Sequence, residues 1–124
     1  MRLLLDTHAA LAFLQDDPRL SADAAAALED PSNQVLLSAV VVWEIAIKRA
    51  IGKLPVDQRY LSLLLDGGVE PLAISLEHAR AVEELPPHHR DPFDRLLVAQ
   101  AAAEHATIVT NDERIGEYNV AVLW

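Results

Sequence analysis

The sequence contains no cysteine. Disulfide bonds, thiolate metal sites and cysteine nucleophiles are therefore excluded, and the composition is compatible with a reducing compartment. The five histidines show no HExxH spacing, which is the usual signature of a zinc hydrolase. Zinc is consequently disfavoured as a cofactor.

Long apolar runs are missing as well. The longest, Val35 to Trp43, is interrupted by Ser38 and falls far short of the ~20 residues that a membrane-spanning helix needs. At the N-terminus, three leucines precede an aspartate, which is too few for the apolar core of a signal peptide. From the sequence we expect a soluble cytoplasmic protein with no membrane association.

Positive charge is scarce, because 10 Lys and Arg stand against 19 Asp and Glu and give a formal net charge of −9. This balance argues against nucleic-acid binding through a broad basic surface, and it suits a basic protein partner. The 124 residues are 52% hydrophobic, which predicts one ordered domain, residues 1–124, around a single core.

Short, wholly apolar segments alternate with helical patterns along the chain. This alternation predicts an α/β domain of three layers, with a mainly parallel central sheet flanked by helices, and it places a ligand site beyond the carboxyl ends of the strands. The predicted strands are Arg2–Leu5, Val35–Leu37, Pro71–Ile74, Thr107–Val109 and Val120–Leu123. The predicted helices are Thr7 to Gln15, Ser21 to Glu29, Ser38 to Ile51, Asp57 to Asp66, Ser75 to Leu85 and Asp91 to His105.

Four acids are predicted to converge at that edge. Asp6 follows the first strand, and Asp112 follows the strand that ends at Val109. Asp94 opens a helix, and Glu44 lies about one and a half turns into the helix that leaves the second strand.

Each acid also has a local explanation. Asp6 can cap the helix that follows it, Glu44 can form a surface i,i+4 pair with Lys48, and Asp112 can be a turn residue. Asp94 can face the helix dipole behind the N-cap Asp91. Their coincidence is the stronger signal, since carboxylates forced together raise one another's pKa unless a cation lies between them. An all-oxygen acidic cluster selects Mg²⁺ or Mn²⁺.

The sequence resembles the PIN-domain ribonucleases, specifically the VapC type, which is the toxin half of a bacterial or archaeal toxin–antitoxin pair. The matching segments, in the order and spacing of the family, are LLLDTHAALAFL, LLSAVVVWEIAIKRAIGKL, HRDPFDRLLVAQA and TIVTNDERIGEYNVAVLW. The resemblance covers essentially the whole chain. It is weakest between Val56 and Leu85.

The resemblance implies a metal-dependent endoribonuclease with Asp6, Glu44, Asp94 and Asp112 as its catalytic acids. Of these, Asp6, Asp94 and Asp112 are the expected ligands of Mg²⁺ or Mn²⁺. Asp6 and Asp94 are expected in direct contact, and Asp112, like Glu44, through water or at a second site. Thr110 is expected to orient a neighbouring ligand or a metal-bound water.

The resemblance also implies partners. The expected substrate is RNA, in this class often a transfer or ribosomal RNA, and the expected protein partner is a VapB-type antitoxin whose C-terminal segment covers the acidic site. A homodimer is expected too, with the leucine-rich helix from Asp57 as a candidate contributor.

The net charge of −9 argues against RNA binding, but five basic residues can form a local rim that attracts a phosphate backbone. The alternative is that they are ordinary solvated charges. His8 can contact a phosphate or be a satisfied structural residue. Trp43 and Phe93 can stack on a base, serve in packing, or form part of a groove for the antitoxin. The five basic residues are Lys48, Arg49, Lys53, Arg90 and Arg95.

Other acid-lined α/β proteins fit less well. A response-regulator receiver needs a late lysine, and none follows Lys53. A haloacid-dehalogenase phosphatase needs a second aspartate where His8 stands. The open alternative is a PIN-like module that docks RNA or a protein without cutting.

Overall fold

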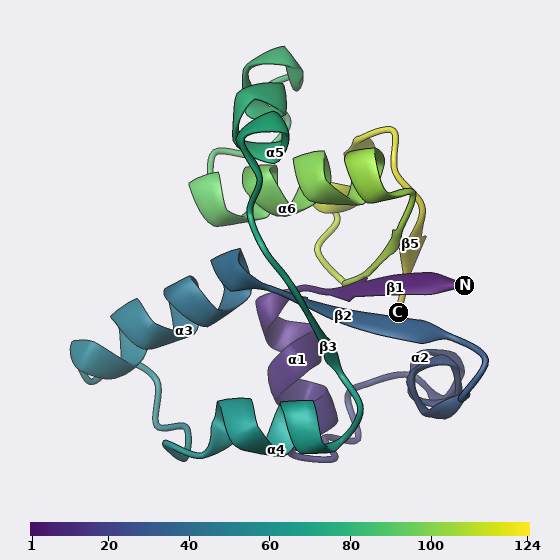
Figure 1. The fold of residues 1–124 in the computed structure, drawn as a ribbon, viewed down its shortest axis with the longest axis vertical. Coiled ribbons are helices and arrows are strands. Elements are labelled where there is room, and N and C mark those ends of the chain that lie inside the picture. Colours follow the sequence, from purple (N-terminus) through teal and green to yellow (C-terminus); the bar gives the residue numbers. More distant parts are fainter.

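The computed structural model describes residues 1–124, and its ribbon is drawn in Figure 1. Five strands form one sheet in the order β3-β2-β1-β4-β5, and every pairing is parallel. The strands are β1 (Arg2–Leu5), β2 (Gln34–Ser38), β3 (Glu70–Leu72), β4 (Thr107–Val109) and β5 (Val122–Leu123). The helices are α1 (Thr7–Leu14), α2 (Ala22–Glu29), α3 (Ala39–Ala50), α4 (Tyr60–Asp66), α5 (Leu76–Ala81) and α6 (Pro92–Glu104).

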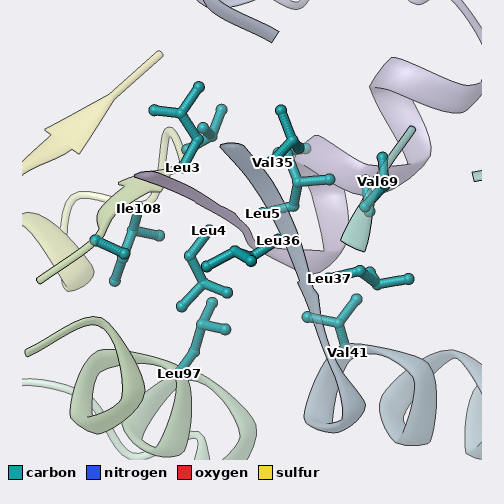
Figure 2. Close-up of a cluster of buried hydrophobic side chains, with 14 of the residues drawn as sticks. Leu3, Leu4, Leu5, Val35, Leu36, Leu37, Val41, Val69, Leu97 and Ile108 are labelled. Atoms are coloured by element: carbon teal, nitrogen blue, oxygen red, sulfur yellow. The ribbon is translucent and has the colours of Figure 1, made fainter. Parts of the chain in front are cut away.

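The first strand is the centre of the sheet. It pairs with β2 on one side and β4 on the other, and Leu3, Leu4 and Leu5 are completely buried. A strand covered on both faces has no position for a polar side chain, which is why this segment is apolar without alternation. Figure 2 shows the result, with Leu4 lying beside Leu97 of α6.

Helices cover both faces of the sheet. In Figure 1, α5 and α6 lie on one side of the strands and α1, α2 and α4 on the other. The helix α3 leaves the carboxyl end of β2, next to the point where α1 leaves β1. The prediction of a parallel α/β sheet with helices on both faces is therefore confirmed.

Element boundaries differ from the sequence prediction in the middle of the chain. Helix α4 begins at Tyr60 because the Asp57 carboxylate accepts the backbone N–H of Arg59 at 2.8 Å and folds the preceding residues into a turn. The helix predicted to reach Leu85 ends at Ala81 and continues as a 3₁₀ turn, Val82–Glu84. Within α4, Leu64 is buried but Leu63 and Leu65 are 44% and 39% exposed, so only part of its apolar surface joins the core.

None of the helices combines the length and the apolar character required to cross a membrane.

Candidate active site

Asp6 lies where β1 passes into α1. Its Oδ1 accepts the backbone N–H of Ala9 at 2.7 Å, so the predicted capping role is real. The residue is only 3% exposed. Burial raises the pKa of its carboxyl group, and the Thr110 side chain and the Ala9 N–H, which stabilise the carboxylate, oppose that rise.

Glu44 projects from α3, whose start is capped by the Ser38 hydroxyl accepting the Val40 N–H at 3.0 Å. The Lys48 ammonium donates to Glu44 Oε2 at 2.6 Å, and the Thr7 hydroxyl donates to Oε1. The predicted i,i+4 pair exists, but the interpretation of Glu44 as a surface residue is wrong, since it is 6% exposed. Both of its oxygens already have a donor.

Asp94 lies in the first turn of α6. That turn is built by Asp91, whose Oδ1 accepts the N–H groups of Phe93 and Asp94 at 2.8 and 3.2 Å, and by Pro92 at the first helical position. Burial, followed by the negative charge of Asp91, raises the pKa of Asp94 from 3.8 to about 7. Glu44 and Asp6 push in the same direction, and His89 opposes them.

Asp112 follows β4. Its backbone N–H donates to Thr110 Oγ1 at 3.0 Å, and its Oδ1 accepts the Arg114 N–H at 2.8 Å. Burial acts to raise the pKa of this carboxyl group, but the net direction is downward, because the hydrogen bond from His89 and the N–H groups of Arg114 and Ile115 stabilise the carboxylate.

The four acids thus come from four different elements and act on one another. Asp94 carries the repulsion of both Glu44 and Asp6, and Asp6 carries that of Asp112. A tighter group lies within this cluster, formed by His89, Asp94 and Asp112, whose candidate ligand atoms are all within 4.8 Å of one another. Asp6 lies outside that group, although the sequence predicts it as a metal ligand.

His89 is the member of this site that sequence reasoning missed. The detectable signal was its position two residues before Asp91, which caps the helix that carries Asp94. Its Nε2 lies 3.1 Å from Asp94 Oδ2 and 3.0 Å from Asp112 Oδ2.

The predicted basic rim divides into structural and exposed residues. Arg95 donates to the carbonyl oxygens of Pro86 and Val82, and Arg49 donates to the Val56 carbonyl, so both guanidinium groups hold loops in place. Lys53 and Arg90 are exposed. Lys48 is engaged by Glu44.

The aromatic residues and His8 also have definite places. The rings of Trp43 and Phe93 pack edge to face with centroids 5.1 Å apart, yet Trp43 remains 56% exposed. His8 is exposed and lines a cavity of about 500 Å³ together with Asn111, Arg19 and Trp124. The exposure of His8 therefore gives no support to the alternative that it is a structural residue.

The donor set suits a hard divalent cation. It consists of carboxylate oxygens with no thiolate, and Asp94 is the acid whose charge is least compensated by the protein. A cation bound beside Asp94 and Asp112 would offset the burial and the repulsion between carboxylates that together raise the Asp94 pKa.

The family model for the PIN domain matches residues 3–121 of this chain. Ribonuclease VapC16 of Mycobacterium tuberculosis is 41% identical over 69 residues. That match covers 49% of this chain and 49% of the relative, so the chain aligns with about half of that protein's length.

Solved structures of the same fold cover nearly all of the chain. VapBC2 from Rickettsia felis, bound to a promoter DNA fragment, is 20% identical over 99% of this chain and 98% of its own, with a TM-score of 0.74. VapBC-1 from nontypeable Haemophilus influenzae is 19% identical over 99% and 97%, with a TM-score of 0.67. A toxin–antitoxin complex from Klebsiella pneumoniae is 19% identical over 98% and 96%, with a TM-score of 0.65.

Proposed function

Because this chain belongs to the PIN-domain family, we propose that it is a metal-dependent endoribonuclease of the VapC type, the toxin of a toxin–antitoxin pair. The observation that carries the proposal is the gathering of Asp6, Glu44, Asp94 and Asp112 at one sheet edge, with the pKa of Asp94 raised to about 7. A stable fold gains nothing from such repulsion. A cation-binding site gains affinity from it.

In this proposal Asp94 and Asp112 would hold the ion, Mg²⁺ or Mn²⁺, and Asp6 would contribute directly or through water. The bound ion supplies charge stabilisation for a phosphodiester and a lowered pKa for water. No side chain is required as a covalent nucleophile.

The protein's own residues orient this chemistry. Thr7 and Lys48 hold the Glu44 carboxylate through one oxygen each, which fixes its direction at the edge of the site. Thr110 accepts the Asp112 N–H and stabilises the Asp6 carboxylate, so one hydroxyl group ties together the ends of β1 and β4. The caps on α1 and α6 fix the remaining acids.

RNA is the proposed substrate, and the net charge of −9 suggests that attraction of its backbone is local, through the bound ion and the exposed Lys53 and Arg90. A VapB-type antitoxin is the proposed partner, supported by the toxin–antitoxin complexes that share this fold. We further propose a homodimer, with the exposed Leu63 and Leu65 of α4 as contributors.

The test is cleavage of a total RNA pool by protein freed of co-purified antitoxin, with Mg²⁺ or Mn²⁺ against EDTA. We expect discrete fragments that require the metal and disappear in Asp94→Asn. The matched control is Asp23→Asn, which removes an exposed acid at the start of α2 and should leave cleavage unchanged. Undiminished cleavage by folded Asp94→Asn protein would contradict the site assignment, and absence of cleavage by a metal-binding wild type would favour a non-catalytic docking module.

A further inference from the structure

His89 lies in the loop that enters α6, and it is held from two sides. Its backbone N–H donates to the Tyr118 hydroxyl at 3.0 Å, and its Nδ1 accepts the backbone N–H of Asp91 at 3.1 Å. The Tyr118 hydroxyl is in turn 3.1 Å from Arg95 Nη1. With its side chain only 7% exposed, the ring has one fixed orientation.

That orientation determines where the ring carries its proton. An Nδ1 that accepts a backbone N–H must present a lone pair, so the single proton of the neutral imidazole is on Nε2. Nε2 faces Asp94 Oδ2 at 3.1 Å and Asp112 Oδ2 at 3.0 Å, and both of these atoms are acceptors. One N–H therefore bridges two carboxylates.

The same arrangement excludes His89 as a metal ligand. To bind a metal through Nε2, the ring would need a lone pair on that nitrogen, so its proton would have to be on Nδ1. The Nδ1 proton would then point at the Asp91 N–H, and two donors would face each other. The three-residue group that His89 forms with Asp94 and Asp112 thus contains two ligand candidates and one hydrogen-bond donor.

We propose that His89 is a positioning residue, which holds the Asp94 and Asp112 carboxylates at a fixed separation through its Nε2–H and does not itself bind the ion. The proposal rests on the metal site of the proposed function. Each of the two carboxylates has a second oxygen, Oδ1, that does not face His89. Asp112 Oδ1 already accepts a hydrogen bond from the Arg114 N–H. Asp94 Oδ1 is then the oxygen that the arrangement leaves most open toward a cation.

The first experiment is a ¹⁵N NMR spectrum of the histidine rings in metal-free protein, assigned with His89→Gln. We expect the Nε2–H tautomer for His89. An Nδ1–H ring would overturn the proposal. This measurement does not involve RNA, so a wild type with the expected tautomer but no RNA cleavage would contradict the proposed function alone.

The second experiment measures Mg²⁺ and Mn²⁺ affinity by calorimetry in wild type, His89→Leu and His89→Gln. Loss of an outer-sphere hydrogen bond typically weakens metal binding by about 10- to 100-fold, and we expect His89→Leu to weaken both ions by the same factor. Glutamine offers an acceptor and a donor as imidazole does, so His89→Gln should recover most of the affinity. The control is His88→Leu, a neighbouring residue whose ring faces Glu117 at 3.6 Å, and it should bind both ions normally.

Two outcomes would overturn the positioning role. A nitrogen ligand favours Mn²⁺ over Mg²⁺, so a His89→Leu protein that loses Mn²⁺ binding far more than Mg²⁺ binding would identify His89 as a ligand. Wild-type affinity for both ions in His89→Leu would show that the bridge is irrelevant. If His89→Leu does not fold, the His89→Gln protein decides alone, because a changed ratio of the two affinities contradicts the proposal and an unchanged ratio supports it.

Discussion

Replacing Asp94 by asparagine should stabilise the metal-free protein at alkaline pH. The carboxyl group has a pKa of about 7 in the fold against an ordinary 3.8, so the folded protein holds this proton more tightly than the unfolded chain does. The contribution of Asp94 to stability is therefore greatest at low pH and is lost as the pH rises from about 4 to about 7. Asparagine imitates the protonated acid and does not titrate.

The size of the effect follows from this difference. The full rise corresponds to about 4 kcal/mol, at ~1.4 kcal/mol for each tenfold change in proton affinity. About 2.6 kcal/mol of it falls between pH 5 and pH 8. The Asp94 side chain is 20% exposed and water screens part of the repulsion, so we expect about 1.5 kcal/mol. For a chain of this size that is a shift in Tm of about 6 °C.

The assay is thermal unfolding followed by circular dichroism in EDTA, at pH 5 and pH 8, for wild type and Asp94→Asn. Comparing the two proteins at each pH cancels the titration of the groups that do not interact with Asp94. The gain of Asp94→Asn over wild type should be about 6 °C larger at pH 8 than at pH 5. An equal difference at both pH values, or a mutant that becomes relatively less stable at pH 8, would refute the argument that Asp94 is held in an unfavourable charged state.

Other perturbations test the ion, the packing and the supporting contacts. Mg²⁺ at a hundred times its Kd should stabilise the wild type by about 2.7 kcal/mol, seen as a rise in Tm that EDTA reverses and that is much smaller in Asp94→Asn. Leu97→Ala, which empties space beside Leu4, should lower the free energy of unfolding by about 3 kcal/mol in urea titrations. Gln100→Leu leaves the buried Ser38 hydroxyl without its acceptor and should cost about 2 kcal/mol in the same titrations. Ser38→Ala in that background should cost about 1 kcal/mol more, because the same hydroxyl caps α3 by accepting the Val40 N–H. Lys48→Met removes the ammonium group that donates to Glu44 and should lower the free energy of unfolding by about 1 kcal/mol. Lys48→Arg keeps the positive charge, so thermal unfolding should show a much smaller loss.

The sheet and the positions of the four acids were predictable because the signals were local. The segments Arg2–Leu5 and Thr107–Val109 are strands with the predicted bounds, and after a partly buried first residue each is apolar, as a strand buried on both faces requires. Ser38 and Asp91 cap the predicted helices. Convergence of the acids followed from the parallel topology, because every strand delivers its carboxyl end to one edge.

What escaped prediction depends on contacts between distant residues. His89 acquires its importance from Asp112 and Tyr118, which lie 23 and 29 positions away, and nothing in the local sequence announces that proximity. Arg95 was assigned to the basic rim because its charge was visible, whereas its carbonyl partners in the 82–86 loop were not.

The central place of β1 has a consequence for synthesis of the protein. The first strand to leave the ribosome must wait for β4, more than 100 residues later, before its second edge is paired and Asp6 can meet Asp112. A nascent or truncated chain that lacks β4 and Asp112 therefore has three of the four acids but no completed site. Assembly of the acidic cluster is therefore coupled to closure of the sheet, because Asp6 and Asp112 come together only when β4 pairs with β1.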